Sequence, residues 1–326
     1  MIDTSQIFQI KNETGFKDMA LKIFKFQFEN NKVYRSFCDL LYKNPSDVKT
    51  IEEIPFLPIQ FFKTHQILSS KNKIEKTFSS SGTTGSITSK HLVTDLNIYK
   101  KSFNEGFKQF YEDIEDYTIL ALLPSYLERE GSSLIYMADS LIKQSKKPKS
   151  GFYLDNLSEL KETLIQLDNQ GEKILLIGVS FALLDLIEEH QFQLKNTIVM
   201  ETGGMKGRRK EIVREELHTI LKDGFGVDNI HSEYGMTELL SQAYSKGKGV
   251  FECSNTMKVL TRDTEDALTI LSQNKTGGIN VIDLANINSC SFIATQDLGR
   301  VNNNGTFEII GRFDNSDIRG CNLMAL

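Results

Sequence analysis

The chain has 326 residues, and 40% of them are hydrophobic, so its length allows one large domain or two with a well-buried core. Its formal net charge is −5, and no run of Lys and Arg is long enough to form a nucleic-acid-binding face. The four cysteines are irregularly spaced without a Cys-x-x-Cys pair, which argues against a metal knuckle or a disulfide framework and favours reduced thiols.

Neither an export signal nor a membrane span is expected. The amino-terminal residues contain no basic lead and no long apolar segment, which a signal peptide requires. The longest apolar stretch, from Ile174 to Ile187, is short and contains Asp185, so it cannot cross a bilayer. These features predict a cytoplasmic protein that binds no nucleic acid.

The first part of the chain is expected to be helical. Residues 16–43 are rich in Phe, Leu and Lys and contain neither Gly nor Pro, which is typical of one or two amphipathic helices. Pro55 and Pro58 then hold the following segment in an extended conformation.

From about residue 94, expected helices alternate with expected buried strands. The strands are 117–124, 173–179 and 197–202, and the helices are 94–111, 131–147, 155–168, a segment ending at Glu189, and 206–222. This alternation implies a mostly parallel sheet with both faces covered. After about residue 245, short β-prone segments separated by Gly and Asn turns predict antiparallel β structure.

A run of small polar residues follows the β-prone residues 76–78. All eight residues from Ser79 to Ser86 carry a small hydroxyl or no side chain, so the run cannot add to a packed core. It is either a flexible surface loop or a loop whose N–H groups and hydroxyls wrap a polyphosphate. Counted from Gly82, Ile87 stands where a Walker A sequence needs its second glycine, and the glycine spacing does not match a dinucleotide fingerprint.

Three later segments favour the phosphate-binding interpretation of that loop. Gly203 and Gly204 follow an expected strand and precede an expected helix, where α/β proteins bind ligands. Residues 234–238 combine an aromatic ring, a glycine, a hydroxyl and a carboxylate. Asp297 and Arg312 lie near the expected ends of short strands. Each segment alone could be an ordinary turn, cap or surface ion pair, but their order after the loop indicates a nucleotide site.

The order of these segments resembles the adenylate-forming superfamily. It is most similar to the acyl-protein synthetases of the LuxE type, which are related to phenylacetate-CoA ligases. The resemblance covers roughly residues 54–321 and is clearest in 80–85, 234–238 and 311–320. It implies an α/β fold with mostly parallel sheets covered by helices, a smaller antiparallel β subdomain and no C-terminal lid domain.

The same resemblance implies a division of the chain. Residues 1–310 would form the adenylate-forming domain, with a helical part over 1–75, an α/β part over 76–245 and a β part over 246–310. Residues 311–326 would hold a short tail and a hinge motif with Asp314, Arg319 and Gly320.

Roles of individual residues are implied as well. The β- and γ-phosphates of ATP would bind to Ser80, Ser81, Gly82, Thr83, Thr84, Gly85 and Lys90. The adenosine would bind to Gly203, Gly204, Tyr234, Gly235, Asp297 and Arg312. Two catalytic residues would act at the phosphates: Thr237 would contact the α-phosphate and Glu238 would hold Mg²⁺.

Two departures from the family pattern concern lysines. Ile87 and Thr88 occupy the positions of a Pro-Lys pair that many members carry, so Lys90 is the candidate substitute. The chain ends six residues after Gly320, and we therefore expect the lid domain and its lysine to be missing. Cys321 follows that glycine, and LuxE-type members are acylated on a cysteine near their C-terminus. Cys321 is therefore the candidate carrier nucleophile.

The implied reaction is the activation of a carboxylic acid, in this family a fatty acid, with ATP and Mg²⁺, followed by transfer to a thiol. The acceptor would be Cys321, a partner reductase or carrier protein, or coenzyme A. Two alternatives stay open. Residues 178–182 resemble the nucleophile elbow of a serine hydrolase or acyltransferase centred on Ser180. The chain could also be a non-catalytic nucleotide- or acyl-binding module.

Overall fold

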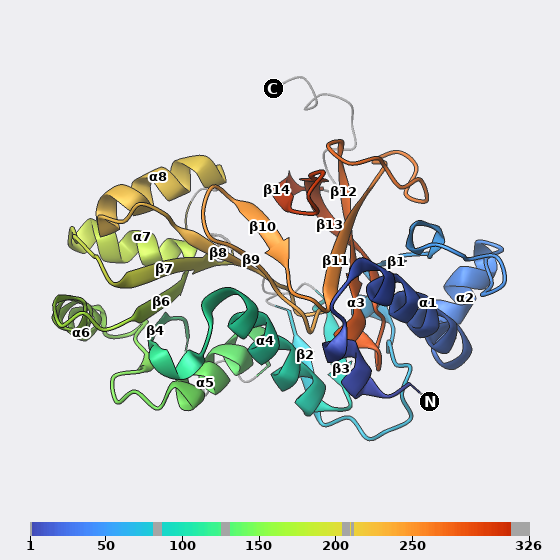
Figure 1. Cartoon of the computed structure of the whole chain (residues 1–326), viewed down its shortest axis with the longest axis horizontal. Helices are drawn as coiled ribbons and strands as arrows, with labels where there is room; N and C mark the ends of the chain where they lie inside the picture. Colours follow the sequence, from blue (N-terminus) through green and yellow to red (C-terminus); the bar gives the residue numbers. More distant parts are fainter. Residues whose placement is uncertain (1, 81–86, 125–130, 204–208, 210–211, 314–326) are drawn as a thin grey trace. The chain divides into compact units, whose positions relative to one another are not determined.

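The computed structural model describes residues 2–80, 87–124, 131–203, 209 and 212–313 (Figure 1). These residues divide into two compact units. The first unit contains the residues up to 77, residues 87–95 and the described residues from 255 onward. The second unit contains residues 78–80 and the described residues from 96 to 254.

The second unit is built on a mostly parallel sheet. Its strands lie in the order β5 (Gly151–Phe152), β4 (Thr118–Leu122), β6 (Ile174–Val179), β7 (Thr197–Thr202), β8 (His231–Tyr234), β9 (Ala243–Ser245) and β10 (Val250–Cys253). The strands from β5 to β8 pair in parallel, and β9 and β10 continue the sheet in antiparallel. All residues of β4 and β6 are buried, because the sheet is covered on both faces.

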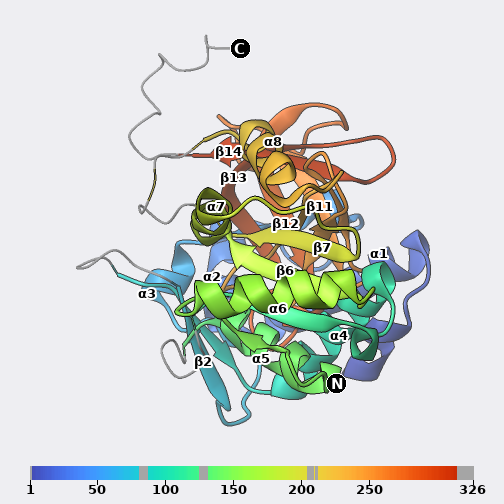
Figure 2. The same ribbon diagram turned by 90° about the vertical axis from the view of Figure 1, so that its left-hand side faces the viewer.

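Helices cover both faces of this sheet (Figures 1 and 2). One face carries α4 (Leu96–Tyr111), α5 (Ser133–Ser145) and α6 (Leu157–Asn169), and the other carries α7 (Ser180–Glu189) and α8 (Arg214–Phe225). A short 3₁₀ turn, Ile114–Asp116, precedes β4. Side chains that cap the helix starts fix two of these boundaries, because Ser132 and Asn156 accept hydrogen bonds from the backbone N–H groups of Ile135 and Glu159. The parallel, helix-covered sheet confirms the predicted α/β class.

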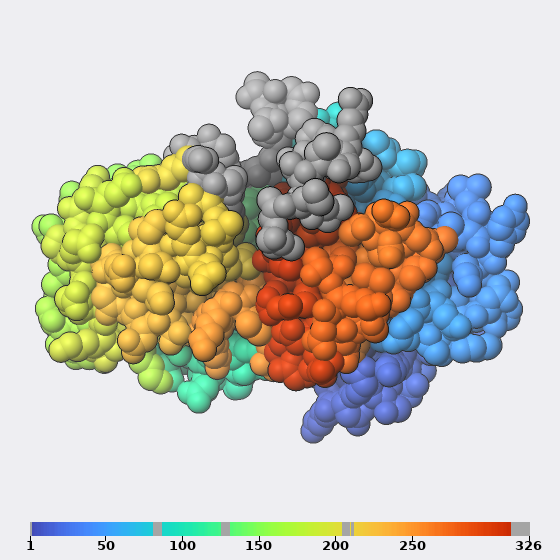
Figure 3. All heavy atoms as spheres, turned by 90° about the horizontal axis from the view of Figure 1, so that it is seen from above, coloured from blue at the N-terminus to red at the C-terminus, as the bar shows by residue number. Residues whose placement is uncertain are grey.

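One helix differs from its predicted span. The sequence predicts a helix over 206–222, whereas α8 begins at Arg214 and ends at Phe225. Residues 204–208, 210 and 211 lie outside the described part. The outer side of α8 is exposed at the surface of the unit (Figure 3), and its inner side buries Leu217, His218 and Leu221.

The contact between α7 and α8 depends on a glycine. A Cβ added at Gly224 would approach Cβ of Ile187 to 2.6 Å, closer than two carbons can pack. We expect Gly224→Ala to lower the free energy of unfolding by about 1–2 kcal/mol, since overpacking outweighs the gain in helix propensity. Gly106→Ala in α4 is the matched control, because its Cβ would meet Ser254 at 3.5 Å and should leave stability unchanged or slightly raised. Equal melting temperatures for the two variants would contradict this packing.

The first unit combines N-terminal helices with an antiparallel sheet. Its helical segments are Thr4–Gln9, α1 (Glu13–Asn30), α2 (Lys32–Leu40), Ile51–Glu53, α3 (Phe61–Thr64) and Leu284–Asn286. Its sheet has the order β11 (Met257–Arg262), β12 (Thr276–Asp283), β13 (Phe292–Val301) and β14 (Phe307–Arg312), with β1 (Leu57–Pro58) parallel to β13. A separate two-stranded sheet consists of β2 (Lys76–Ser79), whose residues 78 and 79 belong to the second unit, and β3 (Lys90–Val93).

Aromatic rings and one amide join the helices of this unit to its sheet. Phe24 and Tyr34 pack on Phe292 of β13. Their ring centroids lie 6.2 and 6.0 Å, respectively, from the ring centroid of Phe292. The amide nitrogen of Gln27, which is fully buried, donates to the backbone oxygens of Asn286 and Ile287. The predicted helical start and antiparallel sheet are therefore present.

The strands of this sheet are longer than the sequence pattern predicts. Asp297 was expected near the end of a short strand, and that expectation is wrong. It lies inside β13, which has 10 residues, and its register partner is Arg312 at the end of β14. The polar residues that follow Thr295 read as a turn in the sequence, but pairing with β12 and β14 on both sides keeps them in the sheet.

Two further sequence expectations can be compared with the described residues. The cysteines among them, Cys38, Cys253 and Cys290, are free thiols. Of the helices that the structure describes, none is both long enough and apolar enough to span a bilayer.

Candidate functional site

A cavity of about 130 Å³ lies at the carboxyl ends of β7 and β8 in the second unit. This edge is where open α/β sheets bind ligands, because loops and helix starts meet beyond the strand ends there. Polar groups predominate in its lining, which comprises Ser79, Tyr99, Ser132, Ser133, Leu134, Met137, Thr202, Gly203, Glu233, Gly235, Met236, Thr237 and Gln242.

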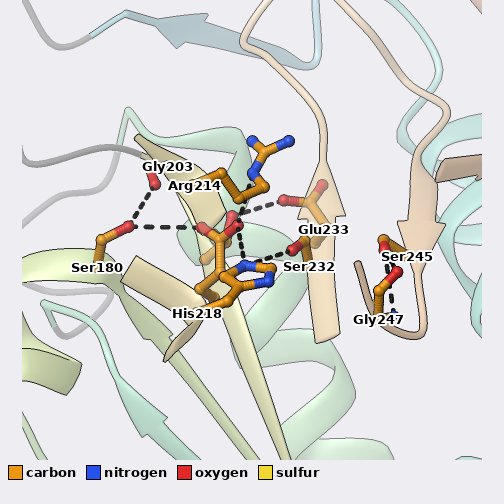
Figure 4. A network of polar contacts seen from close by, with 10 residues as sticks. Ser180, Gly203, Arg214, His218, Ser232, Glu233, Ser245 and Gly247 are labelled. Carbon is orange, nitrogen blue, oxygen red and sulfur yellow. Dashed lines mark hydrogen bonds and ion pairs between the residues drawn. The ribbon is translucent and has the colours of Figure 1, made fainter. Parts of the chain in front are cut away.

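Gly203 shapes the first side of the cavity. It follows β7 with a φ of +66°, a conformation that favours glycine, and it is exposed. The hydroxyl of Ser180 donates to its carbonyl oxygen over 2.9 Å (Figure 4). Ser180 begins α7 directly after β6, so two neighbouring strand ends hold this backbone in place.

Glu233 and Thr202 form a polar pair on the cavity side of the sheet. They are register partners on the adjacent parallel strands β7 and β8, and both line the cavity. The hydroxyl of Thr202 donates to Oε2 of Glu233 over 2.6 Å. Burial raises the pKa of Glu233 to about 7, and the nearby charge of Glu201 adds to this effect. This carboxyl therefore exchanges its proton near neutral pH.

The raised pKa of Glu233 predicts a pH-dependent stability. A carboxyl that binds its proton more tightly in the folded state stabilises the fold at low pH, and this contribution is lost as pH rises through about 7. Between about pH 5 and pH 8 we expect the wild type to lose roughly 2–3 kcal/mol relative to Glu233→Gln, whose amide does not titrate. Urea unfolding at both pH values measures the difference, and parallel pH profiles would contradict it.

A second buried carboxylate, Glu201, faces the other side of β7. Its Oε1 lies 3.5 Å from Nε of Arg214 and 3.5 Å from Nε2 of His218, two residues of α8 (Figure 4). Ser232 of β8, the register partner of Glu201, lies 3.4 Å from the same histidine nitrogen. Glu201 therefore joins α8 to the sheet directly behind the cavity.

Several residues predicted in the second unit meet at this cavity. Gly203, Gly235 and Thr237 line it together, although they come from two strand ends. Glu238 lies in the turn after β8 and is 5% exposed. Tyr234, the predicted base-stacking residue, ends β8 and is buried with its ring 5.9 Å from that of Phe251.

Two of the residues predicted to bind adenosine lie together in the first unit. Nε of Arg312 is 3.2 Å from Oδ1 of Asp297, and the carboxylate is nearly buried whereas the guanidinium is exposed. The buried guanidinium of Arg262 donates to the carbonyl oxygens of Ile279 and Thr295 over 2.7 and 2.6 Å. Burial lowers the pKa of Arg262 to about 10, and the charge of Asp297 opposes this shift.

The remaining predicted residues fall into two groups. Ser80 is half-buried directly after β2, and Lys90 is exposed at the start of β3. The others lie outside the described residues, namely Ser81, Gly82, Thr83, Thr84, Gly85, Gly204, Asp314, Arg319, Gly320 and Cys321.

Ser180 lacks the surroundings of a hydrolase nucleophile. It is 2% exposed, and within the described chain its hydroxyl contacts Gly203 and Glu201 but no histidine. Its strand-to-helix position matches the sequence pattern of a nucleophile elbow, but here the side chain donates to the carbonyl oxygen of Gly203, directly after β7.

Sequence reasoning missed the polar lining contributed by Thr202, Glu233 and Gln242. A glutamate directly before Tyr234, next to the segment predicted to bind the nucleotide, was an available signal, but no strand was predicted there. Its partner Thr202 ends the preceding parallel strand, so alternation along the two strands could have paired them.

Comparisons with known proteins place the chain in a family. The model of the family described as "Acyl-protein synthetase, LuxE" matches residues 6–113 and 132–325. The long-chain-fatty-acid–luciferin-component ligase of Photorhabdus luminescens is 34% identical over 70 residues, which are 21% of this chain and 60% of that protein. The matched segment thus spans less than two thirds of this relative.

Solved structures share the fold at low sequence identity. ATP-bound MatB from Rhodopseudomonas palustris has a TM-score of 0.56 and 14% identity, covering 74% of this chain and 49% of that chain. An open conformation of 2-hydroxyisobutyryl-CoA ligase in complex with 2-HIB-AMP and CoA has a TM-score of 0.70 and 11% identity, covering 93% and 70%. These likenesses show the fold of adenylate-forming ligases. Because the family model matches most of its length, this chain belongs to the LuxE acyl-protein synthetase family.

Proposed function

We propose that this protein joins a carboxylic acid to AMP with release of pyrophosphate and then passes the acyl group to a thiol. The observation that carries the proposal is the convergence of Gly203, Gly235 and Thr237 on one cavity at the ends of β7 and β8. Membership of the LuxE acyl-protein synthetase family supports the same chemistry. The Photorhabdus relative is named a long-chain-fatty-acid ligase, which supports a fatty acid as substrate.

The residues at the cavity fit a nucleotide. Gly203 and Gly235 have no side chain, so a ligand can approach their backbone closely, and Thr237 supplies a hydroxyl beside them. Glu238 lies in the same turn and would hold Mg²⁺ together with phosphate oxygens, as Mg²⁺ sites with few protein ligands do. The ion would neutralise charge on the phosphates during the attack of the acid.

Another part of the cavity lining fits the acid. Residues 132–134, at the amino end of α5, belong to the lining. The amino end of a helix carries partial positive charge and unpaired N–H groups, which favour a carboxylate. The acid would then lie between α5 and Thr237, with its carboxylate oxygen near the proposed position of the α-phosphate.

Asp297 and Arg312 would bind the ribose. The carboxylate of Asp297 is nearly buried and held by a guanidinium at 3.2 Å, so it is oriented to accept hydrogen bonds from neighbouring hydroxyls.

The thiol acceptor is proposed to be Cys321. Its thiolate would attack the acyl carbon of the acyl-adenylate, so that a C–S bond forms, the C–O bond to AMP breaks, and AMP leaves with the electron pair. From Cys321 the group would pass to a partner reductase, a carrier protein or coenzyme A. We propose that the protein acts in the cytoplasm, since reduced thiols are required for these transfers.

Mass spectrometry tests the thiol assignment. After incubation with ATP, Mg²⁺ and a fatty acid, we expect a hydroxylamine-sensitive acyl adduct on the peptide that contains Cys321, and its loss in Cys321→Ser. Cys253→Ser is the control, because Cys253 is a free, half-buried thiol that the proposal does not use. A label that survives in Cys321→Ser, or that lies on Cys253, would reject Cys321 as the carrier.

Pyrophosphate exchange separates this function from non-catalytic binding. A ligase of this type incorporates labelled pyrophosphate into ATP only when its acid is present. A nucleotide- or acyl-binding module would bind ATP and catalyse no exchange.

A further inference from the structure

The sheet of the first unit is irregular next to Asp297. The register of β12 against β13 shifts between Gly278 and Asn280 of β12. As a result, Ile279 lies opposite residues 295–297 of β13, which form a bulge. A bulge interrupts the regular backbone pairing and redirects side chains, and proteins place bulges beside functional sites. The shape of this bulge therefore determines where the carboxylate of Asp297 lies.

Arg262 joins the two strands at the bulge. It ends β11, is 8% exposed, and extends its side chain across β12. Its Nη1 donates to the carbonyl oxygen of Ile279 over 2.7 Å, and its Nη2 donates to that of Thr295 over 2.6 Å. Nη1 also donates to Oδ1 of Asn280 over 2.8 Å. One guanidinium thus bridges β12 and β13 where their backbones are not in regular register.

Asp297 belongs to the same set of hydrogen bonds. Its backbone N–H donates to the hydroxyl of Thr295 over 3.1 Å, and that hydroxyl donates to the carbonyl oxygen of Ile279 over 2.9 Å. Thr295 and Ile279 are the residues whose carbonyl oxygens Arg262 binds. The charges of Arg262 and Asp297 also attract each other, which opposes the lowering of the Arg262 pKa by burial. Arg262 therefore holds the backbone from which the Asp297 side chain extends.

Neighbouring residues fix the guanidinium itself. A Cβ added at Gly278 would lie 2.6 Å from Cζ of Arg262, so this glycine leaves the space that the guanidinium fills. The ring centroid of Phe313 lies 5.7 Å from the same Cζ, and the backbone N–H of Phe313 donates to the carbonyl oxygen of Gln296 in the bulge over 2.7 Å. Packing and hydrogen bonds thus hold one arrangement.

We propose that Arg262 is a positioning residue for nucleotide binding, which holds the bulge of β13 in the shape that presents the Asp297 carboxylate to the ribose. This inference rests on the proposed function, in which Asp297 binds the ribose hydroxyls. Arg262 acts through Asp297, because its own guanidinium is buried and donates to protein oxygens of both strands. Lysine would keep the charge but lacks the planar fork that binds both carbonyl oxygens.

Binding of ATP and of 2′,3′-dideoxy-ATP, measured by isothermal titration, tests the inference. The dideoxy nucleotide lacks both ribose hydroxyls, so the ratio of the two dissociation constants reports recognition of the ribose and not general stability. The wild type should bind ATP more tightly by about tenfold or more, and Asp297→Ala should bind the two nucleotides almost equally. Arg262→Lys and Gly278→Ala should each lower the wild-type ratio by about threefold or more.

A buried amide in the same unit provides the control. Gln27→Leu removes the bonds that Gln27 donates to the carbonyl oxygens of Asn286 and Ile287, so it should lower stability and leave the ratio unchanged. A double variant tests the route of the effect. Arg262→Lys combined with Asp297→Ala should bind ATP as Asp297→Ala alone does, because Arg262 acts through that carboxylate.

The outcomes are distinct. A lower ratio in Arg262→Lys or Gly278→Ala, with an unchanged ratio in Gln27→Leu, supports the inference. A wild-type ratio in folded Arg262→Lys and Gly278→Ala, an equal fall in Gln27→Leu, or additive losses in the double variant overturns it and leaves the ribose assignment intact. Equal binding of both nucleotides by the wild type overturns the ribose assignment and the inference together, and no ATP binding overturns the proposed function. Gly278→Ala keeps the test valid if Arg262→Lys does not fold.

Discussion

Asp297→Ala should weaken ATP binding by about one to two orders of magnitude. A hydrogen bond to a charged group contributes about 1.5–3 kcal/mol, and the two ribose hydroxyls would lose their ionised acceptor. The structure supports a prearranged acceptor, because the Asp297 side chain is nearly buried and ion-paired with Arg312 over 3.2 Å. Isothermal titration of ATP with the wild type and the variant measures the change.

Matched variants separate ribose binding from the loss of a charge. Glu308→Ala removes a carboxylate of β14 that pairs with Arg300 over 3.0 Å, and it should leave ATP affinity unchanged. Asp297→Asn retains one acceptor oxygen without the charge, so its affinity should lie between those of wild type and Asp297→Ala. Unchanged ATP affinity in a folded Asp297→Ala protein would remove the ribose assignment.

Glu201→Ala should lower the free energy of unfolding by about 3–5 kcal/mol. Its side chain is 6% exposed and lies 3.5 Å from both the half-buried Arg214 and the buried His218, so the substitution leaves both groups without their partner. The hydroxyl of Ser180 also lies 3.4 Å from Oε2 of Glu201. Urea unfolding of the purified variant measures the loss.

Controls for this variant come from the same helix and the same position. Glu215→Ala removes an exposed carboxylate in the first turn of α8 and should cost less than about 1 kcal/mol. Glu201→Gln keeps the side-chain shape and one acceptor, so it should recover part of the stability. If Glu201→Ala unfolds at the same urea concentration as Glu215→Ala, the contacts of Glu201 do not hold α8 on the sheet.

The parallel strands could be predicted because burial on both faces leaves a continuous apolar run. The strands expected at 117–124, 173–179 and 197–202 correspond to β4, β6 and β7 with shifts of at most a few residues. Helices between them were recognisable from apolar periodicity. The start of α8 was not, because the charged residues before Arg214 continue a helix-like composition.

Contacts between segments that are distant in the sequence explain the features that sequence patterns did not predict. Asp297 and its neighbours are polar, and only their pairing with β12 and β14 makes them part of a strand. The cavity was partly predictable, because residues 234–238 carry their chemistry within one turn. Gln242 was not, since its role follows from a contact with a cavity and not from any local pattern.

Acid-dependent pyrophosphate exchange measures the proposed activity itself. We expect the wild type to incorporate labelled pyrophosphate into ATP when a carboxylic acid and Mg²⁺ are present. Thr237→Val, which keeps the side-chain volume and removes the hydroxyl, should reduce this rate by about tenfold or more. No exchange by a folded, ATP-binding wild type with any acid tested, or full exchange by Thr237→Val, would contradict the account.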